Sequence, residues 1–395
     1  MPEKLVYILE SNESLEGFRT EISEMAFANQ TPHSRLASQI KALGHNYKVI
    51  GQKELEIVYR KTVLSDRCIY SNELVKKLID EDWIYDSQNQ TGPLTKIECT
   101  LNSSVCFDKK ESLYYDLPLL SRKGTTEIRQ VSLFQVPLNI PESIYPEKNY
   151  RVEIPNLFFQ PIRHWPDVLK AQSLMAREDT IKSVRLFKPL LGEKLLRKIF
   201  NMPRIVRHFN KIGKNCRIHP TATLESCEIG DNVEIGAYTY LRGSRVGNGA
   251  IISEKCSIKL STIGAGAYIL PCDVFNCYIG KNALITTSII FHCVIGDSTF
   301  IGGGVGFSDL NASRGNISTI VNDEIEKSDQ MFLGSAVAEN CFIGAGLMFQ
   351  SGRLIQADTS ILNANMIHKK DFRQNKVYIS DAGKITQIPK QFLNF

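Results

Sequence analysis

The residue types best suited to acid–base chemistry gather around His292. His292 precedes the run Ile295-Gly296-Asp297, and Asp309 and Asn311 follow it. A histidine titrates near neutrality, so within hydrogen-bond reach of an amine or hydroxyl it can accept a proton as a general base. Asp309 or Asn311 would then orient the second reactant. The plainer interpretation is that His292 is a solvent-facing side chain on a turn of a repetitive fold.

These residues lie in a sequence repeat that organises the chain from about 212 to 360. A six-residue period nested in coils of about three hexapeptides predicts a parallel β-helix of triangular section. Each coil buries its aliphatic side chains only against neighbouring coils, so several coils must stack. We expect the glycine after each aliphatic to occupy a corner that requires a small residue or a positive φ. The aliphatic residues that precede glycine recur every 16 to 17 residues, at Ile212, Ile229, Val246, Ile263, Ile279 and Ile295.

The repeat is interrupted after Phe307. Residues 308–330 are polar and charged without the hexapeptide period, and the repeat resumes at Leu333-Gly334. A loop that leaves a regular stack and returns is more often functional than accidental, so we expect this insertion to lie beside the site. We place the β-helix domain at 212–365 and expect the basic residues 366–395 to cap its last coil.

The region before the repeat has a different pattern, which predicts an α/β domain over residues 1–167. Strands alternating with helices favour a small domain with a largely parallel sheet. A polar, helix-compatible stretch follows the first strand as far as Asn29. The third strand leads directly to Ser65-Asp66, which makes Asp66 a candidate ligand for a metal ion. The predicted strands are Leu5–Leu9, Tyr47–Ile50 and Thr62–Leu64, and the predicted helices are Ser34–Leu43 and 72–80.

Length and composition limit the class of protein. A chain of 395 residues exceeds the usual size of one hydrophobic core, so we expect two domains. The net charge of +5 does not by itself imply nucleic acid, and no nucleic-acid partner is expected. No apolar run approaches the roughly 18 residues of a membrane span, and no signal peptide is apparent at the start. The ten cysteines form no C-x-x-C pair, so we expect buried thiols in a reducing cytoplasm.

A basic helical linker is predicted at 168–211. Between Lys182 and Lys211 nine lysines and arginines face a single acidic residue, Glu193, and leucines are interleaved with them. Such a segment could pack its apolar stripe on the β-helix, bind anionic lipid at a membrane surface, or bind nucleic acid. The interruptions at Pro189, Gly192 and Pro203 break a long helix and favour the packing interpretation.

Together these features resemble a bifunctional family that joins an N-terminal sugar-phosphate nucleotidyltransferase domain to a C-terminal left-handed hexapeptide acyltransferase. The most specific local match is Phe291–Asp297 followed by Phe300–Gly304 and Ser308–Asn311. The resemblance implies a left-handed β-helix, a homotrimer, and acyl-donor sites in clefts between neighbouring β-helices.

The resemblance also implies roles for individual residues. His292 would deprotonate the amine or hydroxyl of a sugar, sugar phosphate or nucleotide sugar, which then attacks the thioester of an acyl-CoA such as acetyl-CoA. Asp66 would correspond to a carboxylate that binds Mg²⁺. The residues implied to contact the acyl-CoA are Gly303, Ser335, Ala345, Lys369, Lys370 and Arg373.

Departures from the family pattern keep other functions open. Leu270 and Thr287 stand about where the family has the cations that hold the phosphates of the sugar nucleotide. The acidic run Glu10–Glu16 replaces the glycine-rich loop that would cradle a triphosphate. One alternative is therefore a non-catalytic trimeric protein for sugar-nucleotide binding or assembly, and another is a sugar-phosphate nucleotidyltransferase. A metal-dependent hydratase would need three convergent histidines, for which His219, His292 and His368 are too scattered.

Overall fold

The structure is a computed structural model of the chain. It describes residues 3–27, 29–51, 53–54, 58, 62–81, 84–85, 96–97, 120–121, 127–128, 132–137, 151–155, 158–185, 210–286, 288–311, 316–321, 324–328, 330, 332–362, 367–368, 373–381 and 384–388. The chain divides into two compact units. The first holds residues 1–13, 21–24 and 31–163, and the second holds 14–20, 25–30 and 164–395.

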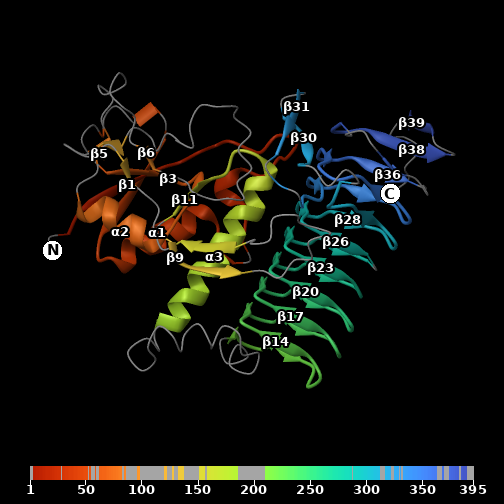
Figure 1. Cartoon of the computed structure of the whole chain (residues 1–395), viewed down its shortest axis with the longest axis horizontal. Helices are drawn as coiled ribbons and strands as arrows, with labels where there is room; N and C mark the ends of the chain where they lie inside the picture. Colours follow the sequence, from red (N-terminus) through yellow and green to blue (C-terminus); the bar gives the residue numbers. More distant parts are fainter. Residues whose placement is uncertain are drawn as a thin grey trace. The chain divides into compact units, whose positions relative to one another are not determined.

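The first unit contains the predicted parallel sheet. Strand β1 (Leu5–Leu9) lies at the centre, with β2 (Asn46–Ile50) on one side and β3 (Val63–Ser65) on the other, both parallel to it. The sheet places the carboxyl ends of β1 and β3 side by side, because Leu9 pairs with Ser65. These elements carry the red and orange colours of Figure 1.

Two helices follow the strands as the apolar spacing predicts. Helix α1 (Pro32–Ala42) begins two residues before the predicted start, because Thr31 and Ser34 form a reciprocal cap around its first turn. Helix α2 (Asn72–Asp80) is capped by the Ser71 hydroxyl, which accepts a hydrogen bond from the Leu74 N–H. The polar stretch after β1 contains, among the described residues, only the short 3-10 helix η1 (Ile22–Glu24).

The other described strands of the first unit form short pairs. They are β4 (Cys68–Tyr70) with β11 (Phe159–Pro161), β5 (Ile84–Tyr85) with β7 (Leu120–Ser121), β6 (Lys96–Ile97) with β8 (Glu127–Ile128), and β9 (Ser132–Pro137) with β10 (Arg151–Pro155).

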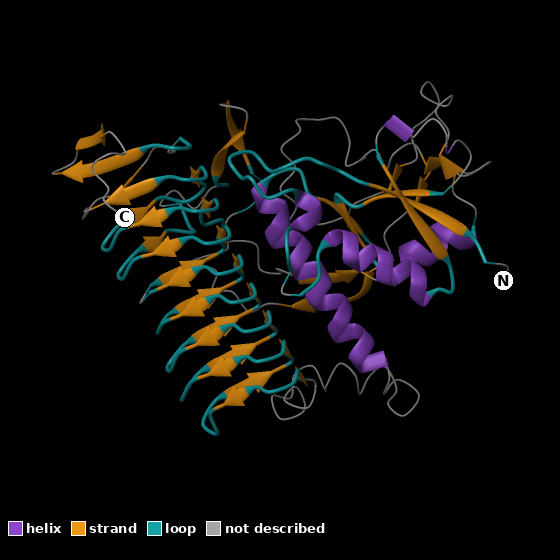
Figure 2. Cartoon of the chain, turned by 180° about the vertical axis from the view of Figure 1, so that it is seen from behind, coloured by secondary structure: helices purple, strands orange, loops and turns teal. Residues whose placement is uncertain are grey.

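The second unit contains the predicted parallel β-helix, which we call the β-solenoid. Its strands are the stack of short orange arrows in Figure 2. In the described part of the chain, the strands of its coils form three sheets. The first sheet consists of β12 (Lys211–Ile212), β15 (Glu228–Ile229), β18 (Arg245–Val246), β21 (Thr262–Ile263), β24 (Tyr278–Ile279), β27 (Val294–Ile295), β32 (Ala336–Val337) and β35 (Leu354–Ile355).

The second sheet consists of β13 (Arg217–Ile218), β16 (Glu234–Ile235), β19 (Ile251–Ile252), β22 (Tyr268–Ile269), β25 (Leu284–Ile285), β28 (Phe300–Ile301), β33 (Phe342–Ile343), β36 (Ser360–Leu362), β38 (Val377–Asp381) and β39 (Lys384–Ile388). The third sheet consists of β14 (Thr223–Glu225), β17 (Tyr240–Arg242), β20 (Ser257–Lys259), β23 (Asp273–Phe275), β26 (Ile289–Phe291), β29 (Gly306–Phe307), β34 (Met348–Phe349) and β37 (Ile367–His368).

The ladder of inward aliphatic residues is confirmed. Ile263, Ile279 and Ile295 are fully buried and lie in register on successive coils of the first sheet. Ile269 and Ile285 do the same in the second sheet. Each coil therefore covers the apolar face of the next, which is why the stack needs several repeats.

The glycine after each aliphatic residue is required for its small size, as expected, but not for a positive φ. The positive φ falls two residues later, for example at Asn232 (58°) and Gly249 (67°). The glycine itself is required by close approach of the next coil. A Cβ on Gly264 would lie 2.4 Å from the carbonyl carbon of Gly280 and 2.5 Å from the Lys281 nitrogen. Backbone atoms cannot yield as a flexible side chain can, so only glycine fits there.

One face of the solenoid is covered by other segments of the same unit. Helix α3 (Trp165–Arg185) packs against β24 and β27. Phe27 packs edge-on against Tyr278, with ring centroids 5.6 Å apart. Both oxygens of the Glu339 carboxylate accept backbone N–H groups, from Arg19 at 2.9 Å and from Thr20 at 3.0 Å. In the first sheet both residues of each strand from β18 to β35 are buried, whereas β12 is exposed.

The predicted insertion leaves the stack after β29 and returns before β32. It carries an antiparallel hairpin of β30 (Ser318–Val321) and β31 (Glu324–Lys327). At the far end, β38 pairs in parallel with β36 and then antiparallel with β39, which closes the last described coil. Residues 186–209, which make up most of the basic segment 182–211, lie outside the described residues. The packing, lipid-binding and nucleic-acid interpretations of that segment therefore remain predictions.

The described cysteines are free thiols, and all but Cys216 are buried, as the sequence predicts. Among the described residues, no helix is long and apolar enough to cross a membrane.

Candidate active site

His292 stands at a corner where the chain turns from the third sheet to the first. On the five successive coils that end with His292, the residue at this corner adopts left-handed backbone, and His292 has a φ of 53°. Its N–H donates to the Phe275 carbonyl at 2.9 Å, and its own carbonyl accepts from the Gly334 N–H at 3.0 Å. We call this column the His292 corner, and its members are Ser226, Gly243, Leu260, Asn276 and His292.

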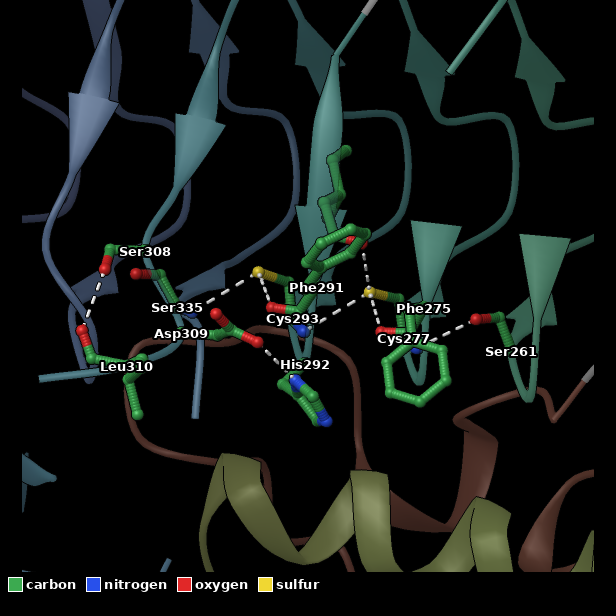
Figure 3. Close-up of polar contacts among 11 residues, drawn as sticks. Ser261, Phe275, Cys277, Phe291, His292, Cys293, Ser308, Asp309, Leu310 and Ser335 are labelled. Carbon is green, nitrogen blue, oxygen red and sulfur yellow. Dashed lines mark hydrogen bonds and ion pairs between the residues drawn. The ribbon is translucent and has the colours of Figure 1, made fainter. Parts of the chain in front are cut away.

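The structure joins His292 to Asp309. Ile289 pairs with Gly306 in the third sheet, so Asp309 falls one coil beyond His292 at the same corner. The His292 Nδ1 atom lies 2.8 Å from the Asp309 Oδ2 atom, and Figure 3 shows the two side chains facing each other. The side chains are 15% and 22% exposed. The pair is therefore shielded from bulk water but still open to a small molecule.

The insertion fixes the backbone of Asp309. Its carbonyl accepts from the Leu333 N–H at 2.9 Å, and Leu310 forms an isolated bridge with Phe332. The start and the end of the insertion are thus tied together next to His292. This agrees with the expectation that the interruption of the repeat lies beside the site.

Two aromatic rings hold the imidazole. Phe332 stacks on His292 with centroids 5.9 Å apart, and Phe275 meets it edge-on at 5.2 Å. Rings on two sides restrict rotation of the imidazole and exclude water from it. Phe332 was not among the predicted site residues, although its place at the end of the insertion could have suggested it.

The pair has the geometry of a general base with an orienting carboxylate. A hydrogen bond from Nδ1–H to Asp309 fixes the tautomer and leaves Nε2 as the acceptor of a proton. The carboxylate also stabilises the imidazolium that forms when Nε2 takes the proton. Such an arrangement suits deprotonation of an amine or a hydroxyl.

Cys293 is not a second nucleophile in this site. It is fully buried, and its Sγ donates to the Phe291 carbonyl at 3.1 Å. Burial, together with the neighbouring thiol of Cys277, raises the pKa of Cys293 well above its ordinary value. A thiol that stays protonated attacks poorly, so a Cys–His mechanism has no support.

Of the other predicted residues, Ser335 lies beside the pair, where its N–H donates to the Cys293 Sγ at 3.4 Å (Figure 3). Asn311 holds the insertion together, since its Nδ2 donates to the Asn316 carbonyl and its Oδ1 accepts from the Ser351 hydroxyl at 3.0 Å. Ser335 is fully buried and donates to the Gln350 carbonyl at 3.2 Å. Gly303 and Ala345 lie on another corner, between the second and third sheets, where the Gly303 carbonyl accepts from the Gly346 N–H.

The remaining donor-site predictions rest on the C-terminal segment. Lys369, Lys370 and Thr287 lie outside the described residues. Arg373 is exposed, and its carbonyl accepts from the Thr359 hydroxyl at 2.9 Å. The exposed position is open to a phosphate but does not by itself indicate one.

Asp66 of the first unit is paired with a histidine that the sequence did not suggest. Its Oδ1 accepts from the Ser11 N–H at 2.9 Å, and its Oδ2 lies 3.1 Å from the His33 Nδ1. Desolvation raises the pKa of the fully buried Asp66 carboxyl, against the opposing hydrogen bonds from His33 and Ser11. His33 follows the cap of α1, and only the sheet brings that helix start to the end of β3.

The described residues do not fit a Mg²⁺ site. Mg²⁺ prefers oxygen ligands in octahedral array, whereas both Asp66 oxygens are engaged within the chain. No group of three His, Cys, Asp or Glu side chains that could hold a metal occurs in the described part of the chain. Mg²⁺ binding by Asp66 remains a prediction.

Comparison with known proteins gives a match to part of the repeat. The family description "Bacterial transferase hexapeptide (six repeats)" matches residues 211–243. No curated protein sequence matches the chain.

Similar solved structures include three transferases. A UDP-N-acetylglucosamine acyltransferase from Bacteroides fragilis shares 17% identity over 45% of this chain and 69% of its own, with a TM-score of 0.27. The polysialic acid O-acetyltransferase OatWY shares 16% over 45% and 87%, with a TM-score of 0.20. PerB from Caulobacter crescentus, solved with CoA and GDP-perosamine, shares 14% over 49% and 65%, with a TM-score of 0.15. At these scores the overall likeness carries no argument about activity.

Proposed function

We propose that the protein is an acyltransferase of the hexapeptide-repeat class that moves an acyl group from an acyl-CoA to a sugar, sugar phosphate or nucleotide sugar. The observation that supports this most is the His292–Asp309 pair, with Nδ1 and Oδ2 2.8 Å apart at the interruption of the solenoid. The partial match of residues 211–243 to transferase hexapeptides agrees with it.

In this proposal His292 is the base. Its Nε2 takes a proton from the acceptor amine or hydroxyl as the freed lone pair attacks the thioester carbonyl carbon. The C–S bond breaks, the acyl group stays on the acceptor, and the proton returns from the imidazolium to the departing thiolate. Asp309 holds the imidazole in the tautomer whose Nε2 can accept a proton, and it stabilises the imidazolium until that proton is transferred to the thiolate.

The donor site is proposed to lie between chains of a homotrimer. His292 occupies one corner of the solenoid, whereas Gly303 and Ala345 occupy another. A pantetheine arm that meets both would therefore contact the second corner on a neighbouring chain. Lys369, Lys370 and Arg373 remain the proposed contacts for the CoA phosphates.

The second sheet offers the surface for such an assembly. Ile251 and Tyr268 are adjacent on its outer face and are 38% and 42% exposed. Large exposed apolar side chains in a row are typical of a protein interface. Multi-angle light scattering should give three times the chain mass, and Tyr268→Glu should reduce it; a monomeric wild-type protein would contradict the assembly.

The function is tested by thiol release. Wild-type protein, His292→Ala and the matched control His219→Ala are incubated with acetyl-CoA and a panel of amino sugars and nucleotide sugars. His219 is a suitable control because it is on an exposed turn, bonded to Thr221. We expect release with wild type and His219→Ala only. No release by wild type above His292→Ala with any acceptor would refute the function.

A non-catalytic binding protein is the main competing function. It predicts that a sugar nucleotide raises the melting temperature while CoA has no effect, because a ligand stabilises only the fold that binds it. Stabilisation by CoA would favour the acyltransferase instead.

A further inference from the structure

Two cysteine side chains meet inside the solenoid, at the corner between the second and third sheets. Cys256 and Cys272 each stand directly before a strand of the third sheet, β20 and β23, and these strands pair in register on adjacent coils. Both side chains belong to the solenoid core, and the two thiols hydrogen-bond to each other. Neighbouring parallel strands lie about 4.8 Å apart, which is within the range of about 4.4 to 6.8 Å that a disulfide spans between Cα atoms.

This thiol pair lies just beneath the surface. Cys272 retains 7% of its surface exposed, and Cys256 retains 1%. Their chain neighbours Lys255 and Asp273 are exposed. A small oxidant such as a peroxide therefore needs only a local opening of this corner to reach the two sulfur atoms.

The hydrogen bond between the thiols favours the reactive form of one of them. The bond from the Cys272 thiol lowers the pKa of Cys256 below its ordinary value, against the opposing effect of burial. The thiolate, rather than the thiol, is the species that a peroxide oxidises. A redox-sensitive cysteine also needs a second thiol nearby to complete a disulfide, and Cys272 is in that position.

A second pair with the same spacing provides an internal comparison. Cys277 and Cys293 are also 16 residues apart, and the Cys293 N–H donates to the Cys277 Sγ at 3.4 Å (Figure 3). Both residues are fully buried. Their Sγ atoms donate to the Phe275 and Phe291 carbonyls at 3.2 and 3.1 Å. These two thiols are closed to solvent and held by the backbone, so they should resist oxidation although they have the same register.

We propose that Cys256 and Cys272 form a site of reversible oxidation, at which a peroxide converts the two thiols into a disulfide that joins adjacent coils. The Cys256 thiolate attacks one oxygen of the peroxide and breaks the O–O bond. Cys256 becomes a sulfenic acid, and the hydroxide that leaves combines with the proton that the thiol lost. Cys272 then attacks the Cys256 sulfur. The S–S bond forms, the S–O bond breaks, and the oxygen leaves with the Cys272 proton as a second water. The two sulfur atoms lose two electrons, and the peroxide gains them.

The test maps the thiols of the folded, full-length protein after oxidation. Reduced protein is exposed to excess hydrogen peroxide, the remaining thiols are blocked with N-ethylmaleimide, and a digest made without reductant is analysed by mass spectrometry. Wild type is compared with Cys272→Ser and with the matched control Cys293→Ser. Serine is tolerated at both positions of the coil, since Ser288 and Ser261 occupy the equivalent positions on other coils.

We expect a cross-linked peptide that joins Cys256 to Cys272 in wild type and in Cys293→Ser, and no link between Cys277 and Cys293. In Cys272→Ser, Cys256 should instead accumulate as a sulfenic acid that dimedone traps. Oxidised wild type should melt several degrees higher than reduced wild type, because the cross-link restricts the unfolded chain. A dithiol reductant should restore the original melting temperature.

Three results would overturn the proposal, and the first does not depend on a variant. One is the absence of the Cys256–Cys272 link in wild type when the peroxide has oxidised the partly exposed Cys216. Another is an equal yield of a Cys277–Cys293 link, which would mean that register alone controls oxidation. The last is a Cys256–Cys272 link that forms as fast in urea as in the folded protein. No acyl transfer is measured, so failure here leaves the proposed function untouched.

Discussion

Substitution of Asp309 by asparagine should remove most of the activity while leaving the fold intact. The carboxylate accepts from Nδ1 over 2.8 Å in a site where both side chains are mostly buried. An asparagine has the same shape, but its NH₂ group can donate to Nδ1 and so place the ring proton on Nε2. In that tautomer His292 cannot accept a proton from the acceptor.

The magnitude follows from the role of the base. General base catalysis contributes roughly 10²- to 10⁴-fold in rate. Asparagine can still accept through its oxygen in part of the molecules, so we expect the lower end, a loss of about 100-fold in kcat. This corresponds to about 3 kcal/mol in the activation barrier. The KM for acetyl-CoA should not change, because Asp309 contacts the His292 imidazole and is not among the residues proposed to contact the acyl-CoA.

The assay is thiol release from acetyl-CoA at saturating acceptor, together with the melting temperature of each variant. The double variant His292→Ala/Asp309→Asn should be no slower than His292→Ala alone, because the two residues act as a unit. Retention of more than about a third of wild-type kcat by folded Asp309→Asn would refute the proposed dyad. A further loss in the double variant would show that Asp309 acts independently of His292.

Two further predictions concern stability. Gly264→Ala should destabilise the solenoid by about 3 kcal/mol in urea unfolding, because its Cβ would meet backbone atoms of the next coil at 2.4 to 2.5 Å. Gly249→Ala, with nothing within 4 Å of its Cβ but a φ of 67°, should cost only about 1 kcal/mol, and equal costs would contradict the close-approach argument. Because burial raises the native pKa of Asp66 above its unfolded value of about 3.9, its contribution to stability is full below that pH and is lost as the pH rises through the native pKa. The melting temperature of wild type relative to Asp66→Asn should therefore fall from about pH 4 to pH 7, and a rising difference would show that the bonds from His33 and Ser11 outweigh burial.

The sequence by itself was sufficient to predict the β-solenoid and the parallel sheet of the first unit. In a solenoid each residue contacts the one 16 to 17 positions away, so the period of the sequence repeat predicts which residues touch. The location of the interruption was predictable for the same reason. The sequence singled out His292 and Asp309, but it assigned Asp309 or Asn311 to orienting the acceptor. The contact of Asp309 with the His292 imidazole came from the structure.

Only the tertiary structure showed the contacts between segments that lie outside the sequence repeat. Phe332 reaches His292 because the insertion returns to its starting corner, and Gln172 reaches Asn276 because α3 packs on the solenoid. His33 meets Asp66 only because the sheet brings the start of α1 to the end of β3. The strict need for glycine at Gly264 also came from packing, since the obstacle is the backbone of another coil. These contacts join segments with no fixed spacing in sequence, and their geometry depends on how whole elements pack.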